Sequence, residues 1–454
     1  MFATINPIDN QTVQSFDSLT ETAIFEKLTL TQHIYYDYWR GLATTERAAF
    51  IKKIGERLLA NLENYAALIT LEMGKPITQS RAEIEKCAWL CDYFAANAAT
   101  FLNDKIIQTD YHKSYVHYEP LGAVFGIMPW NFPFWQAFRF AIPALCAGNV
   151  ILLKPAPNVP QCGLAMAQLF DEVVGKAGIF QTLLVEVEQV ESIIAHPIVR
   201  GVALTGSDRA GATVAALAGK HLKRCVMELG GSDPFIVLDD ADIAEAAKFG
   251  MLSRMNNAGQ TCIAAKRFIV HESIAEAFLQ QLEANLEQLN IGDPSLESTN
   301  LGTLARPDLH EQLARQVQDS VNQGATVRYE SDSVNADGNF FKPMILANVL
   351  PGMPAYEQEL FGPVVTLFTV ANDAEAIRLA NDSIYGLGAS IWSQNPERAQ
   401  SIAKQLEVGF VAINDFVKSD PRLPFGGMKR SGFGRELAEE GIKEFVNVKT
   451  IVIK

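Results

Sequence analysis

Short apolar runs rich in β-branched residues alternate with helix-like stretches between Val124 and Glu228. Strands are expected at Val124–Ile127, Val150–Leu153, Leu183–Val187, Val202–Leu204 and Cys225–Glu228. Strands that alternate with helices form a parallel sheet, because each helix returns the chain to the same edge and covers a face of the sheet. This part of the chain therefore predicts an α/β domain of the dinucleotide-binding type.

The alternation starts again after Gly230–Gly231 and predicts a second α/β domain. Strands are expected at Phe235–Leu238, Lys266–His271, Val364–Thr369, Ala389–Trp392 and Gly409–Ile413, and helices at Glu46–Glu72, Thr78–Phe101, Ala241–Asn256 (capped by Asp239 or Asp240) and Ile274–Leu289. A chain of 454 residues is too long for one hydrophobic core, so two or three domains are expected. Because no low-complexity linker separates them, we expect the domains to pack firmly with a cleft between them.

The composition excludes several classes of partner. The formal net charge of −14 would repel phosphate backbones, so neither nucleic acid nor an anionic membrane surface is expected as a partner. The sequence starts without a basic segment followed by an apolar one, and it has no run of eighteen apolar residues. A cytoplasmic protein is therefore expected.

The six cysteines are scattered and favour reduced thiols over a disulfide framework. Cys87 and Cys91 lie one helical turn apart, but no second Cys or His pair stands at ligand spacing. A buried helix face is the better interpretation of this pair, and no metal site is predicted.

Glu228 and Cys262 form the pair of reactive groups that most strongly indicates a function. Cys262 follows a Gly-Gln-Thr loop that suits a nucleophile at a domain cleft, and Glu228 ends a predicted strand, where ligand crevices of α/β sheets form. A thiol that attacks a carbonyl and a carboxylate that activates water can oxidise an aldehyde through a thioester. Such an oxidation also needs a hydride acceptor, which the first α/β domain would bind.

Seven short motifs resemble those of the aldehyde dehydrogenase superfamily, in its order and over nearly the whole chain. They are Pro129-Trp130-Asn131-Phe132-Pro133, Lys154-Pro155, Leu204-Thr205-Gly206-Ser207, Glu228-Leu229-Gly230-Gly231, Gly259-Gln260-Thr261-Cys262, Glu359-Leu360-Phe361-Gly362-Pro363, and Pro-Phe-Gly-Gly-x-Lys-x-Ser-Gly-x-Gly-Arg-Glu at 424–436. Among subfamilies, Ala156-Pro157-Asn158 and Gly230-Gly231-Ser232-Asp233-Pro234 are most similar to bacterial NAD(P)-dependent succinate semialdehyde dehydrogenases.

The resemblance implies a fold with three parts. These are a variant Rossmann-type NAD(P)-binding domain (1–109 and 121–229), an α/β catalytic domain (230–431), and a small β oligomerisation element (110–120 and 432–454). In the family, the terminal strand joins the sheet of a partner subunit. A homodimer or homotetramer is therefore expected, as also follows from a terminal strand at Val448–Ile453 with no later residues to cover its edge.

The resemblance also assigns roles to individual residues. Cys262 is expected to be the nucleophile, Glu228 the base, and the Asn131 amide, with the Cys262 backbone N–H, the donors to the oxyanion. Gly206 and Ser207, at a helix N-terminus in place of G-x-G-x-x-G, are expected to face the pyrophosphate. The other expected cofactor contacts are Lys154 (adenosine ribose), Glu359 (nicotinamide ribose), and Trp130 and Phe361, which shape the pocket.

The substrate expected from the subfamily is a semialdehyde with a far carboxylate, first of all succinate semialdehyde. Arg139 and Ser419 match residues that bind this carboxylate in the subfamily, but Asn256 stands where a second arginine is usual. Whether Arg254, Lys418 or Arg422 replaces that arginine is left open. The other functions considered are oxidation of a broad range of small aldehydes, and reduction of an acyl phosphate or acyl-CoA, which would not need Glu228.

Position 157 bears on the choice between NAD and NADP. NAD-preferring members of the family often have a glutamate three residues after the strand-ending lysine, where it repels a 2′-phosphate, but this chain has Pro157. Lys154 could pair with that phosphate. Either cofactor is therefore expected to work.

Overall fold

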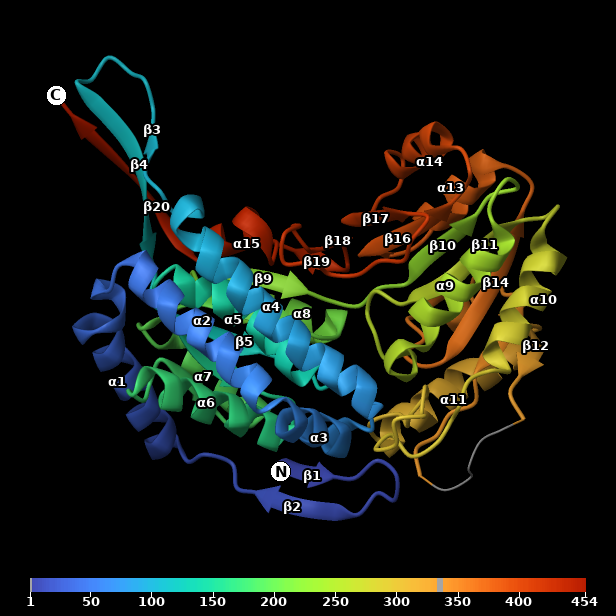
Figure 1. Ribbon diagram of the computed structural model, residues 1–454, viewed down its shortest axis with the longest axis horizontal. Helices are drawn as coiled ribbons and strands as arrows, with labels where there is room; N and C mark the ends of the chain where they lie inside the picture. The colour runs from blue at the N-terminus through green and yellow to red at the C-terminus, as the bar shows by residue number, and fades with distance from the viewer. Residues whose placement is uncertain (1, 333–337) are drawn as a thin grey trace.

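The strands and helices fold around two separate sheets, which lie toward opposite ends of the long axis in Figure 1. The computed structural model describes residues 2–332 and 338–454. A hairpin of β1 (Phe2–Ile5) and β2 (Thr12–Phe16) runs along the lower edge of this view, and a three-stranded ribbon projects from the end that carries the first sheet.

The first sheet has six strands in the order β19-β9-β8-β5-β6-β7. Their bounds are β5 (Ala123–Ile127), β6 (Val150–Lys154), β7 (Phe180–Thr182), β8 (Val199–Thr205), β9 (Arg224–Glu228) and β19 (Gly432–Phe433). All pairs are parallel except that of β19 with β9. The parallel sheet predicted from the alternation is confirmed, and β19, from beyond residue 431, adds an edge strand to it.

The strand predicted at Leu183–Val187 is wrong, because the chain pairs with β6 three residues earlier, over Phe180–Thr182. A polar residue can occupy this buried strand because the Gln181 amide donates to the Lys27 carbonyl at 2.8 Å. Val187 begins a 3-10 helix instead, η2 (Val187–Gln189).

Helices pack around the first sheet and position the segments that follow its strands. They are α1 (Glu21–Asp37), η1 (Trp39–Gly41), α2 (Thr44–Ala60), α3 (Leu62–Met73), α4 (Ile77–Phe101), α5 (Pro133–Cys146), α6 (Pro160–Val174), α7 (Val190–Ala195), α8 (Asp208–Lys220) and α15 (Ala438–Lys443). The long helix α4 packs against α2, α3 and α5, while α5 contacts β5 and β6. The helix predicted over Glu46–Glu72 is interrupted at Asn61, whose amide donates to the Arg57 carbonyl at 3.0 Å and so competes with the helical hydrogen bonds.

The second sheet has seven strands in the order β12-β13-β14-β11-β10-β16-β17, of which only the β12–β13 pair is antiparallel. The strands are β10 (Asp233–Val237), β11 (Ala265–His271), β12 (Thr326–Glu330), β13 (Met344–Ala347), β14 (Val364–Val370), β16 (Gly388–Trp392) and β17 (Phe410–Ile413). The helices of this part are α9 (Ile243–Met255), η3 (Asn256–Gly259), α10 (Ala275–Leu286), α11 (Pro307–Asn322), α12 (Pro354–Glu357), α13 (Asp373–Asn381) and α14 (Pro396–Ala403).

The predicted cap of α9 is wrong by two or three residues. Asp242 caps the helix by accepting from the Glu245 backbone N–H at 3.1 Å. Asp239 and Asp240 instead form ion pairs with Arg398, at 2.7 and 3.3 Å.

The projecting ribbon has the order β20-β4-β3 and contains the C-terminal strand. Its strands are β3 (Lys105–Ile106), β4 (Lys113–Pro120) and β20 (Val446–Ile453), and a further two-stranded pair joins β15 (Tyr385–Gly386) to β18 (Met428–Lys429). Strand β20 pairs with β4 along its whole length, from Val446 opposite Pro120 to Ile453 opposite Lys113. The other edge of β20 is unpaired within the described part of the chain.

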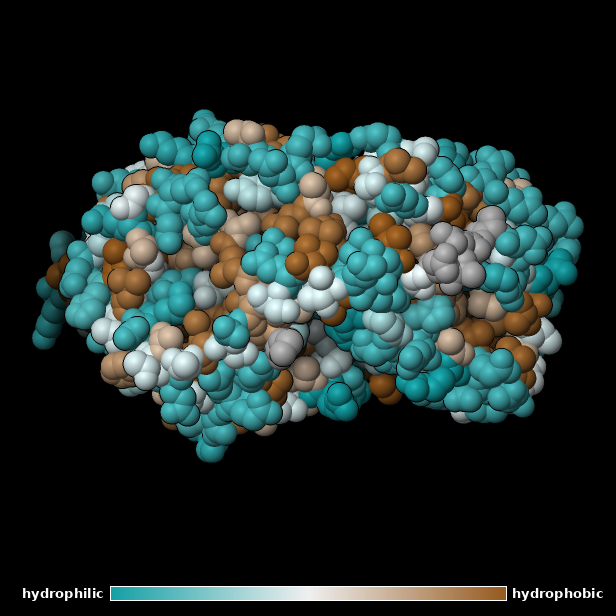
Figure 2. Space-filling view, turned by 90° about the horizontal axis from the view of Figure 1, so that it is seen from below, coloured by the Kyte–Doolittle hydropathy of each residue, from teal (hydrophilic) through white to brown (hydrophobic). Residues whose placement is uncertain are grey.

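The surface seen from below in Figure 2 is largely hydrophilic, with apolar residues in small patches among polar ones. Across residues 2–332 and 338–454, no helix combines the length and the apolar character needed to cross a bilayer.

Glu72 is a buried carboxylate that joins three elements around the first sheet. It accepts hydrogen bonds from the Thr4 hydroxyl of β1 at 2.6 Å, and from the backbone N–H groups of Gln161 and Cys162 in α6 at 3.0 and 2.9 Å. Burial raises the pKa of Glu72, while these donors lower it.

We expect Glu72→Gln to lower the stability of the protein by about 1–3 kcal/mol, because an amide nitrogen cannot accept from the Cys162 N–H and leaves a buried donor unpaired. The measurement is urea unfolding followed by circular dichroism. Glu85→Gln, at an exposed position of α4, is the control and should leave the midpoint unchanged. Equal midpoints for both variants would contradict this role of Glu72.

Candidate active site

Cys262 lies in a tightly fixed loop between η3 and β11. Gly259 has a positive φ of 75°, and a Cβ atom there would lie 2.3 Å from the Gly362 carbonyl oxygen. The Gln260 side chain accepts from the Ala305 backbone N–H at 2.9 Å, which fixes the loop on its other side. The glycine and the glutamine before the thiol therefore hold Cys262 in one place.

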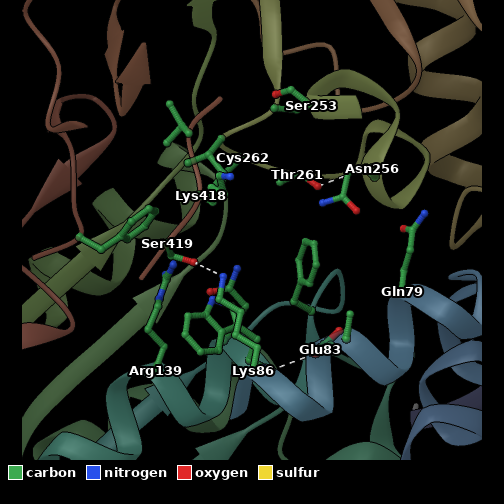
Figure 3. Close-up of a pocket in the computed structure, with 18 of the residues that line it drawn as sticks. Gln79, Glu83, Lys86, Arg139, Ser253, Asn256, Thr261, Cys262, Lys418 and Ser419 are labelled. Carbon is green, nitrogen blue, oxygen red and sulfur yellow. Dashed lines mark hydrogen bonds between the residues drawn. The ribbon is translucent and has the colours of Figure 1, made fainter. Parts of the chain in front are cut away.

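Two cavities meet at Cys262, which lines both of them. The first, of about 390 Å³, is lined by Pro129, Trp130, Asn131, Gln136, Thr205, Gly206, Ser207, Asp208, Leu229, Gly230, Cys262, Leu309, Gln312, Gln316, Gln358, Glu359, Phe361 and Tyr385. The second, of about 210 Å³, is shown in Figure 3 and is lined by Gln79, Ala82, Glu83, Lys86, Phe132, Trp135, Gln136, Arg139, Ser253, Asn256, Thr261, Cys262, Ile263, Ala264, Phe416, Val417, Lys418, Ser419 and Phe425. We call them the nucleotide-side cavity and the substrate-side cavity.

Burial raises the pKa of the Cys262 thiol to about 12, against the opposing effect of the Arg139 and Lys266 charges. The thiol is therefore protonated near neutral pH. Lys266 is held nearby, because its ammonium donates to the Cys262 carbonyl at 2.7 Å and to the Thr261 carbonyl at 3.0 Å. The two cations favour the thiolate without outweighing burial.

Asn131 lies in the loop between β5 and α5 and lines the nucleotide-side cavity together with Cys262. Its side-chain amide donates to the Gln260 backbone carbonyl at 2.9 Å, and the Asn131 backbone carbonyl accepts from the Asn257 side-chain amide, also at 2.9 Å. Because an amide group carries two N–H bonds, one remains for a ligand. The structure thus brings Asn131 beside the Cys262 loop, as its predicted oxyanion role requires.

Glu228 ends β9 and is 2% exposed. Neither of its carboxylate oxygens has a hydrogen-bond partner among the described residues. Burial raises the pKa of Glu228 well above its usual value, while the nearby charge of Arg139 opposes this. Its side chain is not among those that line the two cavities. Burial therefore favours the protonated carboxyl, which lies outside the lining of both cavities.

Arg139, on α5, reaches the substrate-side cavity with its charge already paired. The guanidinium forms a buried ion pair with Glu436 and lies 4.5 Å from the centre of the Phe425 ring. The charges of Glu228 and Cys262 also act on it. Ser419 lines the same cavity and accepts a hydrogen bond from the Lys86 ammonium at 2.8 Å. Arg139 and Ser419 are therefore brought together, but Arg139 is not a free cation.

The residues considered as substitutes for a second arginine differ in position. Arg254 is buried outside the cavities and donates to the Leu360 carbonyl at 2.8 Å. Lys418 lines the substrate-side cavity but pairs with Asp415 at 2.8 Å, and Arg422 pairs with Asp420 at 2.6 Å. None of the three brings an unpaired charge into the cavity.

Lys86, which lines the substrate-side cavity from α4, belongs to none of the motifs that indicated the other site residues. Gln79, Glu83 and Lys86 stand at helical spacing, so they share the face that α4 turns toward this cavity. That spacing was readable in the sequence, but nothing in it indicated that this helix borders the Cys262 loop.

The nucleotide-side cavity contains most of the predicted cofactor contacts. Ser207 caps α8 by accepting from the Ala210 backbone N–H at 3.3 Å, which leaves its hydroxyl proton free to donate. Trp130 and Phe361 meet edge to face with their ring centres 5.8 Å apart, forming an apolar wall. A helix N-terminus beside an apolar wall fits a phosphate-bearing dinucleotide.

Two predicted cofactor contacts have other neighbours in this structure. Glu359 lines the cavity, where it pairs with Lys266 at 3.2 Å and accepts from the Gly231 backbone N–H at 3.1 Å. Lys154 ends β6 and does not line the cavity. Its carbonyl accepts from the Met128 N–H at 3.0 Å, and its ammonium lies 5.5 Å from the centre of the Phe2 ring.

Comparison with known proteins matches residues 1–451 to the aldehyde dehydrogenase family. The chain is 48% identical over 451 residues to the probable succinate-semialdehyde dehydrogenase (NADP(+)) of Synechocystis sp., covering 99% of both chains. It is 45% identical over 414 residues to the succinate semialdehyde dehydrogenase (NAD(P)+) Sad of Escherichia coli, covering 91% of this chain and 89% of the relative. The structure of succinic semialdehyde dehydrogenase from Streptococcus pyogenes in complex with NADP+ matches all of both chains, with a TM-score of 0.97 and 36% identity.

The pKa of Cys262 predicts how its alkylation depends on pH. In the cofactor-free protein, the rate of modification by iodoacetamide should rise about tenfold per pH unit from pH 7 to 9, because the thiolate fraction grows in that proportion below the pKa. Mass spectrometry of the Cys262 peptide measures this rate. Lys266→Met, which removes a charge that favours the thiolate, should slow modification at each pH. A rate that levels off by pH 8 would contradict the raised pKa.

Proposed function

Because the chain belongs to the aldehyde dehydrogenase family, we propose that it oxidises succinate semialdehyde to succinate with NADP or NAD. The observation that carries this proposal is the position of Cys262, which lines both the nucleotide-side and the substrate-side cavity. A nucleophile at this junction can be reached by an aldehyde from one side and by a nicotinamide from the other. The names of the relatives support the substrate and the cofactors.

In the proposed reaction, the Cys262 thiolate attacks the carbonyl carbon and the aldehyde oxygen becomes negatively charged. The free N–H of the Asn131 amide and the Cys262 backbone N–H would donate to this oxyanion. One such donor lowers the barrier by roughly 3 kcal/mol. The Lys266 and Arg139 charges favour the thiolate that starts the reaction.

The residues of the nucleotide-side cavity would hold the cofactor. Gly206 and Ser207 would face its pyrophosphate, Trp130 and Phe361 would bound the nicotinamide, and Glu359 would turn from Lys266 to the ribose. Bound NAD or NADP would accept the hydride that leaves the carbonyl carbon, so that the thiohemiacetal on Cys262 becomes a thioester.

Glu228 is the proposed base for thioester hydrolysis. It would take a proton from the attacking water, after which the acid leaves and the Cys262 thiolate is restored. Its raised pKa means that the carboxyl must first lose its own proton, and the Arg139 charge favours that loss. An enzyme that reduced an acyl phosphate or acyl-CoA would have no use for this base.

The ribbon of β3, β4 and β20 supports a homodimer or homotetramer. Strand β20 presents an unpaired edge within the described residues, and apolar side chains on the ribbon are exposed: Ile106, Val448, Val452 and Ile453. An exposed strand edge with apolar side chains favours pairing with another chain. The domain boundaries given above and a location in the cytoplasm stay predictions.

We expect Glu228→Gln to transfer hydride once per active site and then stall at the thioester. The amide has nearly the same size and shape as the carboxyl, so the fold should be kept, while steady-state turnover should fall by at least about 100-fold because an amide cannot act as a base. Stopped-flow absorbance of the reduced cofactor, with succinate semialdehyde as substrate, measures both phases.

Cys262→Ala is the control for this experiment and should show neither the burst nor turnover. The wild type should release free succinate, which chromatography distinguishes from an acyl-CoA product. Unimpaired turnover by Glu228→Gln would remove Glu228 from the base role, and a wild type that fails to oxidise succinate semialdehyde would refute the proposed function.

Pro157 is exposed and lies three residues beyond Lys154, which is 6% exposed. Because no carboxylate stands at position 157 to repel a 2′-phosphate, we expect kcat/KM for NADP and NAD to differ by no more than about 100-fold. Pro157→Glu should shift the ratio toward NAD by at least about tenfold, since the new carboxylate repels the phosphate and can accept from a ribose hydroxyl. Separate titrations of the two cofactors give the ratio.

The matched control is Pro157→Gln, which changes the shape at this position without adding charge and should leave the ratio close to that of the wild type. A ratio that does not respond to glutamate, or that responds equally to glutamine, would show that the charge at position 157 does not select the cofactor.

A further inference from the structure

We propose that Lys86, together with Ser419, binds the far carboxylate of the semialdehyde and so determines substrate specificity. Lys86 would thereby replace the second carboxylate-binding arginine of the subfamily, at whose position this chain has Asn256. This inference rests on the proposed function and adds to it a residue that distinguishes an acid semialdehyde from a neutral aldehyde.

Lys86 lies on the cavity-facing side of α4, across the cavity from the Cys262 loop. Figure 3 shows its amine directed toward Ser419, and the hydrogen bond between the two is 2.8 Å long. The Trp135 ring lies on the same side, with its centre 4.3 Å from the Lys86 nitrogen. An ammonium and a hydroxyl that already lie side by side can both donate to one carboxylate.

Lys86 differs from the other cations around the cavity because it has no acidic partner. Among the described residues, no carboxylate oxygen lies within 4.0 Å of its nitrogen, whereas Arg139 pairs with Glu436 and Lys418 with Asp415. Glu83, on the same helix face, is already bound by the Lys75 ammonium and by the Phe134 and Trp135 backbone N–H groups, at 2.9 and 3.0 Å for the latter two. A partly buried ammonium without a counter-charge favours an anionic ligand.

The surroundings of Lys86 make its charge sensitive to pH near the physiological range. Burial, and then the positive charge of Arg139, lower the pKa of Lys86 to about 8, against the opposing charges of Cys87, Asp420 and Glu83. Lys86 is thus an ammonium at pH 7 and loses its charge as the pH rises past about 8. Lys418 and the Cys262 thiol are the other titratable groups that line this cavity together with Lys86, Arg139 and Glu83.

The cavity suits a short chain with an aldehyde at one end and a carboxylate at the other. Its catalytic end is at Cys262, and its other polar groups include Lys86 and Ser419. Phe132, Trp135 and Phe425 also line the cavity and supply apolar surface for the methylene groups. A neutral aldehyde of the same length would contact those walls without engaging Lys86.

The test compares succinate semialdehyde with butanal, a neutral aldehyde of the same chain length, in the wild type and in Lys86→Met. The variant should raise KM for succinate semialdehyde by about 10- to 100-fold, as expected for loss of a hydrogen bond to a charged group. Its kcat should stay within about threefold, and KM for butanal within about twofold. Lys86→Arg, which keeps the charge, should restore most of the affinity for the acid.

Lys418→Met is the matched control, because it removes another lysine of the same cavity whose charge is already paired. It should change KM for succinate semialdehyde less than about twofold. Circular dichroism and the butanal activity verify that each variant is folded.

A second measurement follows the ratio of kcat/KM for succinate semialdehyde to that for butanal as a function of pH. The Cys262 thiol serves both substrates, so its ionisation cancels in this ratio. The ratio should fall above about pH 8 in the wild type, as Lys86 loses its charge, and stay level to pH 10 in Lys86→Arg, because a guanidinium keeps its proton there.

The outcomes separate this inference from the proposed function. If the wild type prefers succinate semialdehyde but Lys86→Met leaves its KM unchanged, or raises both KM values equally, the role of Lys86 is refuted while the function stands. If the ratio of kcat/KM for succinate semialdehyde to that for butanal does not fall above pH 8 in the wild type, the role of Lys86 is also refuted. A wild type that prefers butanal over succinate semialdehyde refutes the proposed function itself.

Discussion

Arg139 carries a positive charge among three buried acidic groups, and the resting state of the site depends on this balance. Glu436 forms an ion pair with it, while Glu228 and the Cys262 thiol act on it at longer range. Burial is the largest influence on all three acids and raises their pKa values, while the charge of Arg139 opposes it at each of them. Burial therefore favours the protonated forms of Glu228 and Cys262 in the resting protein.

In the proposed reaction, Arg139 acts on both the nucleophile and the base. Its charge favours the Cys262 thiolate and the Glu228 carboxylate alike. After acylation the sulfur carries no charge, so Glu228 and Glu436 are then the acidic groups that remain under the influence of Arg139.

The segment from Phe425 to Glu436 builds this arrangement, although it comes after the last strand of the second sheet. Gly426 leaves room for Glu228, since a Cβ atom there would lie 2.8 Å from a carboxylate oxygen of that residue. Ser431 joins the two parts of the fold by donating to the Gly230 carbonyl at 2.6 Å and accepting from the Gly386 backbone N–H at 3.0 Å. Gly426 of this motif therefore allows the chain to pack closely around the proposed base.

Patterns local in the sequence predicted much of the fold and of the site, and contacts distant in sequence account for the rest. Alternation of strands and helices predicted both parallel sheets, because burial on both faces requires apolar strands. It failed at Leu183–Val187, because the strand forms three residues earlier around the hydrogen-bonded Gln181, and at Asn61, whose side chain interrupts a helical pattern. Asn131 and Cys262 meet because the loop after β5 is hydrogen-bonded to the loop before β11, through the Asn131 amide and the Gln260 carbonyl. The pairing of Arg139 with Glu436 could not be predicted, since no local spacing relates the two.

A cavity that must both activate a thiol and hold a carboxylate needs positive charge at two places. Arg139 has its charge directed at Glu436, Glu228 and Cys262, so an anionic substrate would compete with these acids for it. Lys86 lies on a helix outside both sheets, with a hydroxyl and an aromatic ring as its neighbours, although the charge of Arg139 lowers its pKa. The lysine can therefore bind an anion without breaking the ion pair between Arg139 and Glu436. Since α4 packs against α5, which carries Arg139, the separation between the two cations is fixed by helix packing in the first part of the fold.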